Sequence, residues 1–368
     1  TKSILAFTEL GKGKFEFVYI TKNKPDLFEI DDVKDKVIET LTYENRTVNK
    51  YILDGSTFFS MALEDKLVVS SSQILLENLI RSKGERKLDP TLEKLYRIAN
   101  PDKPATIFIN AKDANSLLYS MAKEGSTIDF SHFSDWISLD IDMGQDHIDL
   151  NGVSMANDSI KQYINLFKNT APLENITSQF APANADAIAS FTFGDYSKFS
   201  KNQQLYLDKS AVVDTLFKAV EEIGIIYLNS KKTVLLNTFG SERILQFLDG
   251  IKKGRSEYQG TEIVELNSDD FLNRYFKPII KGFHANYYTL LDNAFLFSPD
   301  QETLQTVIGN YKNGTTFNTT SLYTSAKGNL ADESSILFIS NADGIPQLLQ
   351  DDFTDEFYKL FHSSEKNP

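Results

Sequence analysis

Hydrophobic residues recur in the same order in two distant stretches of the chain, Asp65 to Asn110 and Asp292 to Ser340. Each stretch begins with a short apolar strand that ends in serine (Ser70 or Ser298) and continues into a helical pattern. The apolar helix positions are Ile74, Leu75 and Leu79 in the first stretch and Leu304, Val307 and Ile308 in the second. A glycine-containing basic turn, a second helical patch and a β-rich strand follow in both. Such a recurrence predicts a duplicated supersecondary unit.

Alternating apolar residues predict several strands around the first stretch. Two strands are expected at Ile4–Leu10 and Phe15–Ile20 around a Gly11-Lys12-Gly13 turn, and three more at Val48–Leu53, Thr57–Leu63 and Lys66–Val69. A helix capped by Asp31 or Asp32 is expected between them, because Val33, Val37, Ile38 and Leu41 fall on one helical face. A further helix is expected at Ala114–Ala122, and a hairpin at Trp136–Asp142 and His147–Met155. A helix at Ile160–Phe167 ends this part.

The second half repeats much of this order. A strand at Ala187–Phe193 precedes helical patterns at Tyr196–Tyr206 and Val212–Ile223. A strand pair at Gly224–Leu228 and Thr233–Phe239, a helix at Glu242–Ile251, and strands at Thr261–Leu266, Gly282–Leu290 and Asn293–Phe297 then match the first half. A last helical pattern covers Phe353–Phe361. The correspondence extends over about 110 residues, as expected of a duplicated module.

These elements predict an α+β fold of two tandem related modules, each a mostly antiparallel sheet with helices packed on one face. Pro172, Pro182 and weak periodicity mark residues 169–184 as a linker. The predicted modules are therefore residues 1–168 and 185–368. The strand and helical patterns from Ala187 to Ile223 precede the second copy and have no counterpart before the first. The Trp136 hairpin follows the first copy and has no counterpart after the second. We therefore expect the first module to lack its N-terminal part and the second its C-terminal part.

Composition narrows the class of protein. The 368 residues are 41% hydrophobic and 24% charged, which is typical of soluble globular domains. A net charge of −13 argues against nucleic acid or an anionic membrane as the main partner. The absence of cysteine excludes disulfides, thiol catalysis and cysteine-bound metals. No apolar run reaches the roughly 18–20 residues of a transmembrane helix. No signal peptide is recognised in these residues, and a processed chain would already have lost one.

The densest polar cluster lies in the predicted hairpin between Asp140 and Asp149. Its alternating aspartates and Gly144 resemble an oxygen-ligand calcium loop, although no glutamate closes the loop. A two-faced hairpin explains the same alternation. In that interpretation the inward residues are Ile137, Leu139 and Ile141, and the solvated residues are Ser138, Asp140 and Asp142. We favour the two-faced hairpin and keep calcium binding as the alternative.

The other polar motifs favour structural roles. The histidines (His132, His147, His284 and His362) lack the spacing of a metal pair, and no G-x-S-x-G motif supports a Ser-His-Asp triad. Gly11-Lys12-Gly13 lacks the third glycine of a dinucleotide loop. The acidic pairs at 31–32, 269–270 and 351–352 stand where helix caps are expected. We therefore assign no catalytic, cofactor-binding or metal-binding residue and no cofactor.

Short glycosylation patterns also occur. N-x-[ST] triplets begin at Asn45, Asn157, Asn175, Asn313 and Asn318, as expected by chance in a chain rich in Asn, Ser and Thr. Asp158-Ser159-Ile160 matches the short acceptor pattern for O-linked glycans in the Bacteroidetes periplasm, so Ser159 is a candidate acceptor.

Three features of the sequence carry a resemblance to a known family. They are the serine-helix-glycine-turn-helix-strand runs at 70–110 and 298–340, the Leu150-Asn151-Gly152 end of the Trp136 hairpin, and the segment 191–196. The chain resembles uncharacterised cell-envelope proteins of Bacteroidetes and related bacteria, a family of domains of unknown function with a duplicated α+β module. The resemblance implies export to the periplasm, outer membrane or cell surface of a Gram-negative bacterium. Some members of the family are lipid-anchored, which in this chain would require an N-terminal part that precedes the given residues. The family offers no catalytic residue to transfer.

These patterns predict a non-catalytic binding or scaffold protein, a subunit or accessory of a larger outer-membrane or periplasmic assembly. Its partner would be a protein, or a glycan, held by sheet edges or by the groove between modules. The alternative is an envelope-polymer (glycan) hydrolase with carboxylates in the inter-module cleft. A third interpretation, a calcium-stabilised adhesion module, depends on the Asp140–Asp149 hairpin.

Overall fold

The structure is a computed structural model that describes residues 2–11, 13–23, 36–53, 55–82, 87–124, 126, 129–144, 147–209, 215–267, 270–341 and 353–355. The chain forms two compact units, Thr1–Glu93 with Lys112–Ser120, and Lys94–Ala111 with Met121–Pro368. Their boundary crosses helices α2 (Pro90–Ile98) and α3 (Ala111–Met121). All strand pairings among the described residues are antiparallel, which confirms the α+β class.

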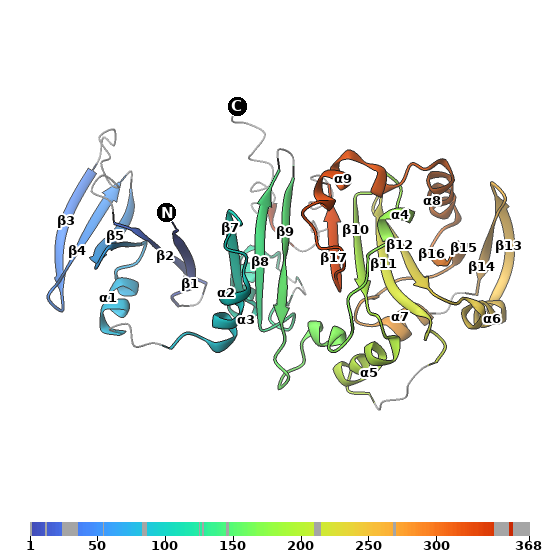
Figure 1. Cartoon of the computed structure of the whole chain (residues 1–368), viewed down its shortest axis with the longest axis horizontal. Helices are drawn as coiled ribbons and strands as arrows, with labels where there is room; N and C mark the ends of the chain where they lie inside the picture. Colours follow the sequence, from blue (N-terminus) through green and yellow to red (C-terminus); the bar gives the residue numbers. More distant parts are fainter. Residues whose placement is uncertain are drawn as a thin grey trace. The chain divides into compact units, whose positions relative to one another are not determined.

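The first unit is a six-stranded sheet in the order β1-β2-β6-β5-β4-β3. Its strands are β1 (Ile4–Glu9), β2 (Phe15–Lys22), β3 (Lys36–Tyr43), β4 (Arg46–Leu53), β5 (Ser56–Leu63) and β6 (Lys66–Ser70). Helix α1 (Gln73–Ser82) packs on β5 and β6 (Figure 1). Leu76 and Ile80 of this helix are buried against Met61 and Val68, whereas Ile74 is exposed. Of the apolar positions that the sequence assigns to this helix, Leu75 and Leu79 are half-buried and Ile74 is in solvent.

Strand β3 replaces part of a predicted helix. The sequence from 36 to 43 contains β-branched and aromatic residues in alternation, which favour an extended chain. A two-residue turn at Glu44 and Asn45, both with positive φ, then folds β3 onto β4. The helix predicted through Val37, Ile38 and Leu41 was wrong for this reason. Residues 31–35 lie outside the described part.

The second unit contains a three-stranded sheet in the order β7-β8-β9. Its strands are β7 (Ala105–Asn110), β8 (Trp136–Met143) and β9 (Ile148–Met155). The predicted hairpin at Trp136–Met155 is confirmed. The helix predicted at 160–167 is a 3₁₀ helix, Tyr163–Phe167.

The same unit holds an eight-stranded sheet in the order β13-β14-β15-β16-β12-β11-β10-β17. Its strands are β10 (Ala187–Thr192), β11 (Val220–Leu228), β12 (Lys231–Thr238), β13 (Lys252–Tyr258), β14 (Thr261–Leu266), β15 (Tyr287–Leu291), β16 (Ala294–Ser298) and β17 (Ile336–Ser340). The helical pattern predicted at Val212–Ile223 was wrong over 220–223, which begins β11; its residues 212–214 lie outside the described part. The strand predicted from Gly282 begins only at Tyr287, and β13 was not predicted.

Helices cover both faces of the eight-stranded sheet (Figure 1). Helices α5 (Tyr196–Tyr206), α6 (Glu242–Gly250) and α7 (Phe271–Phe276) bury one face, and α4 (Thr177–Phe180), α8 (Gln301–Asn313) and α9 (Ser321–Lys327) bury the other. The predicted single helical face was wrong for this sheet. The physical reason is its consecutive apolar residues, such as Phe295, Leu296 and Phe297, which point to opposite faces and are all buried.

Segment 169–184, which the sequence marks as a linker, is part of this packing. Thr177, Phe180 and Ala181 are buried, and Phe180 stacks on Tyr311 of α8. The module boundary at 169–184 stays a prediction. Among the described residues, no helix is long and apolar enough to cross a membrane.

The two larger sheets share a strand order. Six strands of the larger one follow as β11-β12-β16-β15-β14-β13, the same succession as β1-β2-β6-β5-β4-β3. The strand before the main helix ends in a fully buried serine in each sheet. Ser72 donates its backbone N–H to Ser70 Oγ (3.0 Å), and Asp300 donates its own to Ser298 Oγ (3.3 Å). The sheets differ beyond β11, where β10 and β17 continue the larger one.

Candidate functional site

The aspartates of the β8–β9 hairpin are each engaged by a different protein group. Asp140 accepts hydrogen bonds from Thr106 Oγ1 (2.7 Å) and the Asn100 backbone N–H (3.2 Å). Asp142 forms an ion pair with Lys103. Within the described ranges, no group of three or more His, Asp or Glu residues converges on a point where a metal could bind.

The faces of this hairpin differ from the prediction. Ile137 is buried as expected, but Ser138 is buried too, and Asp140 and Asp142 are half-buried. The residues that face solvent include Met143 and Ile148 instead. The prediction that Ser138, Asp140 and Asp142 face solvent was therefore wrong, because the two aspartates bind Thr106, Asn100 and Lys103.

The three described histidines each lie near an aspartate. His132 is 3.7 Å from Asp129, and His284 is 3.3 Å from Asp270, and these side chains are exposed. The third, His147 Nε2, lies 3.4 Å from Oδ2 of buried Asp149, which also accepts a hydrogen bond from Asn329 Nδ2 at 2.8 Å. This arrangement ties the hairpin to the loop after α9. His362 lies outside the described residues.

Ser159 lies in an exposed turn beside exposed Ile160. Its backbone N–H donates to Asn157 Oδ1 (2.9 Å), and neighbouring Asp158 pairs with Lys168 (2.6 Å). The candidate glycan acceptor is therefore on the surface.

Glu222 is a buried carboxylate in β11, only 1% exposed, that sequence reasoning missed. Its Oε1 accepts from Thr177 Oγ1 (2.5 Å), Ser190 Oγ (2.6 Å) and the Thr177 N–H (3.0 Å), and its Oε2 accepts from the Ile176 N–H (3.0 Å). Burial raises the pKa of this carboxyl, and the four hydrogen bonds lower it in part. Four protein donors therefore replace the water around this side chain.

The polar network around Glu222 extends to Ser334, which lies just before β17. Asn175 Nδ2 donates to Ser190 Oγ (2.7 Å), and Ser334 Oγ donates to Asn175 Oδ1 (2.6 Å). Thr192 Oγ1 donates to the Ser334 carbonyl (2.7 Å). These bonds join segment 173–177, β10, β11 and the residues before β17, so the network fastens β10 into the sheet.

Strand β1 has a different environment. It is one of the two end strands of its sheet, and every one of its residues is exposed. Ile4, Leu5 and Phe7 are 58%, 56% and 65% exposed. Because adjacent side chains point to opposite faces of a strand, β1 presents apolar side chains on both faces as well as an edge.

A hydrogen bond beside the first residue of β2 defines which backbone groups of β1 face outward. Leu10 donates its N–H to the Lys14 carbonyl (2.8 Å), which identifies a hydrogen-bonded pair just past the register pair Glu9–Phe15. Bonded pairs alternate along an antiparallel ladder, so the residues that bond to β2 are Ile4, Ala6 and Thr8. The N–H and C=O groups of Leu5, Phe7 and Glu9 therefore point to the open edge.

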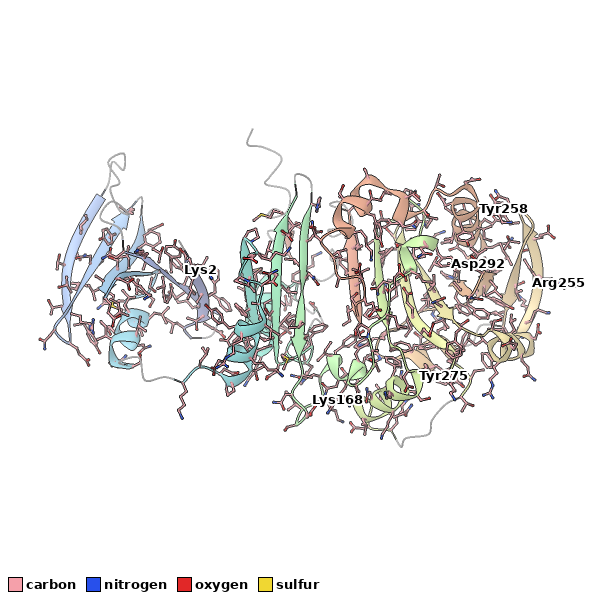
Figure 2. All side chains as sticks on the ribbon, in the orientation of Figure 1. Lys2, Lys168, Arg255, Tyr258, Tyr275 and Asp292 are labelled. Atoms are coloured by element: carbon pink, nitrogen blue, oxygen red, sulfur yellow. The ribbon has the colours of Figure 1, made fainter. Side chains whose placement is uncertain are left out.

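The edge of β1 lacks the protection seen at β13, one of the two end strands of the larger sheet. Strand β13 carries Lys252, Lys253, Arg255 and Glu257 and has a register irregularity between Lys252 and Gly254. Figure 2 shows Arg255 on this outer strand. Charges and bulges deter pairing with other chains, whereas β1 has Glu9 as its single charge and contains no proline. The β1 edge, residues 4–9, is therefore the candidate functional site.

Comparisons of the chain with protein-family models, curated proteins and solved structures give no match.

Proposed function

We propose that the protein is a non-catalytic binding or scaffold protein of the bacterial cell envelope, and that it holds a protein partner at the β1 edge. The observation that carries this proposal is an apolar end strand with three outward-facing backbone positions, Leu5, Phe7 and Glu9. An extended peptide adds to such an edge through main-chain hydrogen bonds, and its side chains supply specificity. The envelope location is part of the proposal, and its support is the resemblance described in the sequence analysis.

We further infer that the two larger sheets are copies of one module. Their common strand order, the buried serines Ser70 and Ser298, and the helix that follows each serine support this inference. The buried helix positions also match in spacing. Leu76 and Ile80 lie three and seven residues after the first residue of α1, and Leu304 and Ile308 do so in α8.

The test is site-specific photo-cross-linking in the native cell. A photoreactive phenylalanine analogue replaces Phe7 in the full-length protein, and the matched control carries it at Arg255 on the charged edge of β13. We expect one defined protein partner to be cross-linked from position 7 and none from position 255. A partner captured equally from both positions, or from neither, would contradict binding at the β1 edge.

The hydrolase alternative stays a prediction. Glu222 has the raised pKa of many catalytic acids, but its oxygens are occupied by Thr177, Ser190 and Ile176, which favours a structural role. Release of sugars from purified envelope glycans, abolished by a single carboxylate substitution, would favour the hydrolase instead.

A further inference from the structure

We propose that the partner docks as a donor strand, antiparallel to β1, with small residues opposite Leu5 and Phe7 and a larger apolar residue opposite Ala6. This inference rests on the proposed function and on the correspondence of the two modules. In the larger sheet the edge that matches β1 is occupied by β10. The sequence and register of β10 therefore describe what the β1 edge accepts.

The register follows from the strand pairings. When Ser70 of β6 is aligned with Ser298 of β16, the residues before them, Val69 and Phe297, are aligned too. In the neighbouring strands, Val69 pairs with Tyr19 and Phe297 pairs with Val234. One strand further out, Tyr19 pairs with Leu5 and Val234 pairs with Ile225. Leu5 therefore corresponds to Ile225. By the same count, Ile4 corresponds to Gly224, Ala6 to Ile226 and Phe7 to Tyr227.

Backbone hydrogen bonds independently support this register. Phe193 donates its N–H to the Glu221 carbonyl (3.0 Å), one step past the pair Thr192–Glu222. Because bonded pairs alternate along an antiparallel ladder, the backbone groups of Ile223, Ile225 and Tyr227 are the ones that bond to β10. Ile225 and Tyr227 are the counterparts of Leu5 and Phe7, whose backbone groups face the open edge. The two edges therefore present the same pattern of donors and acceptors.

Two alanines of β10 lie opposite large side chains of β11. Ala189 lies opposite Ile225, Ala187 lies opposite Tyr227, and Ile188 lies opposite Ile226. On β1 the large residues Leu5 and Phe7 would face small residues of the donor, and Ala6 would leave room for a branched one. A donor strand with this alternation would cover apolar surface on both faces of β1 and pair its outward N–H and C=O groups.

The experiment uses the intact protein and a synthetic peptide with the sequence of residues 186–194, Asp-Ala-Ile-Ala-Ser-Phe-Thr-Phe-Gly. The control peptide carries N-methyl groups on the alanines at 187 and 189, which removes the N–H groups that would bond to β1. Amide hydrogen exchange is measured at Leu5, Phe7, Ile225 and Tyr227. We expect the peptide to slow exchange at Leu5 and Phe7 on the order of tenfold or more, with no change at Ile225 and Tyr227.

A protein variant keeps the test specific. In Leu5→Pro the backbone loses an N–H that faces outward and makes no bond to β2, so we expect the strand to be retained and peptide protection at Phe7 to be lost. Retention of the sheet is checked by far-ultraviolet circular dichroism, and Phe7→Lys is the second variant if the proline disturbs it.

The outcomes separate this inference from the proposed function. Unchanged exchange at Leu5 and Phe7 under saturating peptide overturns the donor strand, even if cross-linking at position 7 still identifies a partner. A concentration-dependent dimer that Leu5→Pro abolishes, without any effect of peptide, also overturns it and assigns the edge to a second copy of the chain. Protection by the peptide and none by its N-methylated control supports it.

Discussion

Strands β1 and β11 occupy the same place in two sheets of the same strand order, yet one is exposed and the other is buried. Leu5 of β1 is 56% exposed, whereas its counterpart Ile225 is 9% exposed. The difference comes from their neighbours, because β10 pairs with β11 and the Glu222 network fastens it there, while β1 pairs with β2 alone among the described strands. The burial of an apolar strand is therefore set by what lies beside it, not by its own sequence.

A proline at the two matched positions should give the largest contrast. Ile225→Pro removes an N–H that bonds to β10 and deletes a buried side chain, so we expect the second unit to lose more than about 3 kcal/mol of unfolding free energy. Leu5→Pro removes an N–H that faces the open edge, where proline is tolerated, and should cost less than about 1 kcal/mol. Urea unfolding of both variants measures the difference.

The measurement needs a signal from each unit: far-ultraviolet circular dichroism reports both, and the transition that tryptophan fluorescence does not follow belongs to the first unit. Trp136, the single tryptophan of the chain, lies in the second unit, so its fluorescence follows that unit. Equal losses in the two proline variants would show that the β1 edge is covered in the native protein.

The next contrast is between Gly224 and its counterpart Ile4. A Cβ added at Gly224 would lie 2.2 Å from Thr177 Oγ1, a donor to Glu222. Gly224→Ile should therefore destabilise the second unit by about 3 kcal/mol, through overpacking and displacement of Thr177. Ile4→Ala, at an exposed position, should change stability by less than about 0.5 kcal/mol. Thermal unfolding of the two variants tests this, and a tolerated Gly224→Ile would contradict the close packing of Thr177 on β11.

The variant Glu222→Gln tests whether the network that holds β10 on β11 depends on pH. In the variant, the NH₂ group of the glutamine amide, itself a donor, would face the donors of Ile176 and Thr177. We therefore expect the unfolding free energy to fall by about 1–3 kcal/mol near pH 4. Burial raises the folded-state pKa of Glu222 above its unfolded value. The stabilisation that the protonated carboxyl provides is therefore complete below the ordinary glutamate pKa of about 4.3 and is lost as pH rises through the raised pKa.

The stability advantage of the wild type over Glu222→Gln should consequently shrink as pH rises. Denaturant unfolding between pH 4 and 8 measures it, with Glu221→Gln in the same strand as the control for loss of one negative charge. An advantage that grows with pH would mean that the four hydrogen bonds outweigh burial and that the folded protein favours the carboxylate.

Local sequence patterns predicted most of the strands but not their partners. Alternation and turn residues located β4, β5 and β6, and consecutive apolar residues located β11 and β16. The helix predicted over Val37–Leu41 was wrong because Val, Ile and Leu at that spacing fit one helical face as well as an alternating strand, and the following turn decided between them. Such ambiguity is intrinsic to short apolar runs.

The candidate site could be predicted only in part. The strand at Ile4–Leu10 was predicted, but its edge position depends on which strands pair beside it. The Glu222 network was missed because its members are far apart in sequence. Thr177 is 45 residues from Glu222, and Asn175 is 159 residues from Ser334. A single glutamate in an apolar strand gives no local sign of such partners.

Residue-resolved amide hydrogen exchange of the isolated protein tests the open edge most directly. The N–H groups of Leu5 and Phe7 face outward, so we expect their exchange to be within about tenfold of an unprotected amide, while Ile225 and Tyr227 exchange only through large-scale opening of their unit. Ala6, whose N–H bonds to β2, serves as the internal control for fraying of β1. Protection at Leu5 and Phe7 equal to that at Ile225 and Tyr227 would contradict the account, because it would mean that β1 already has a second neighbour.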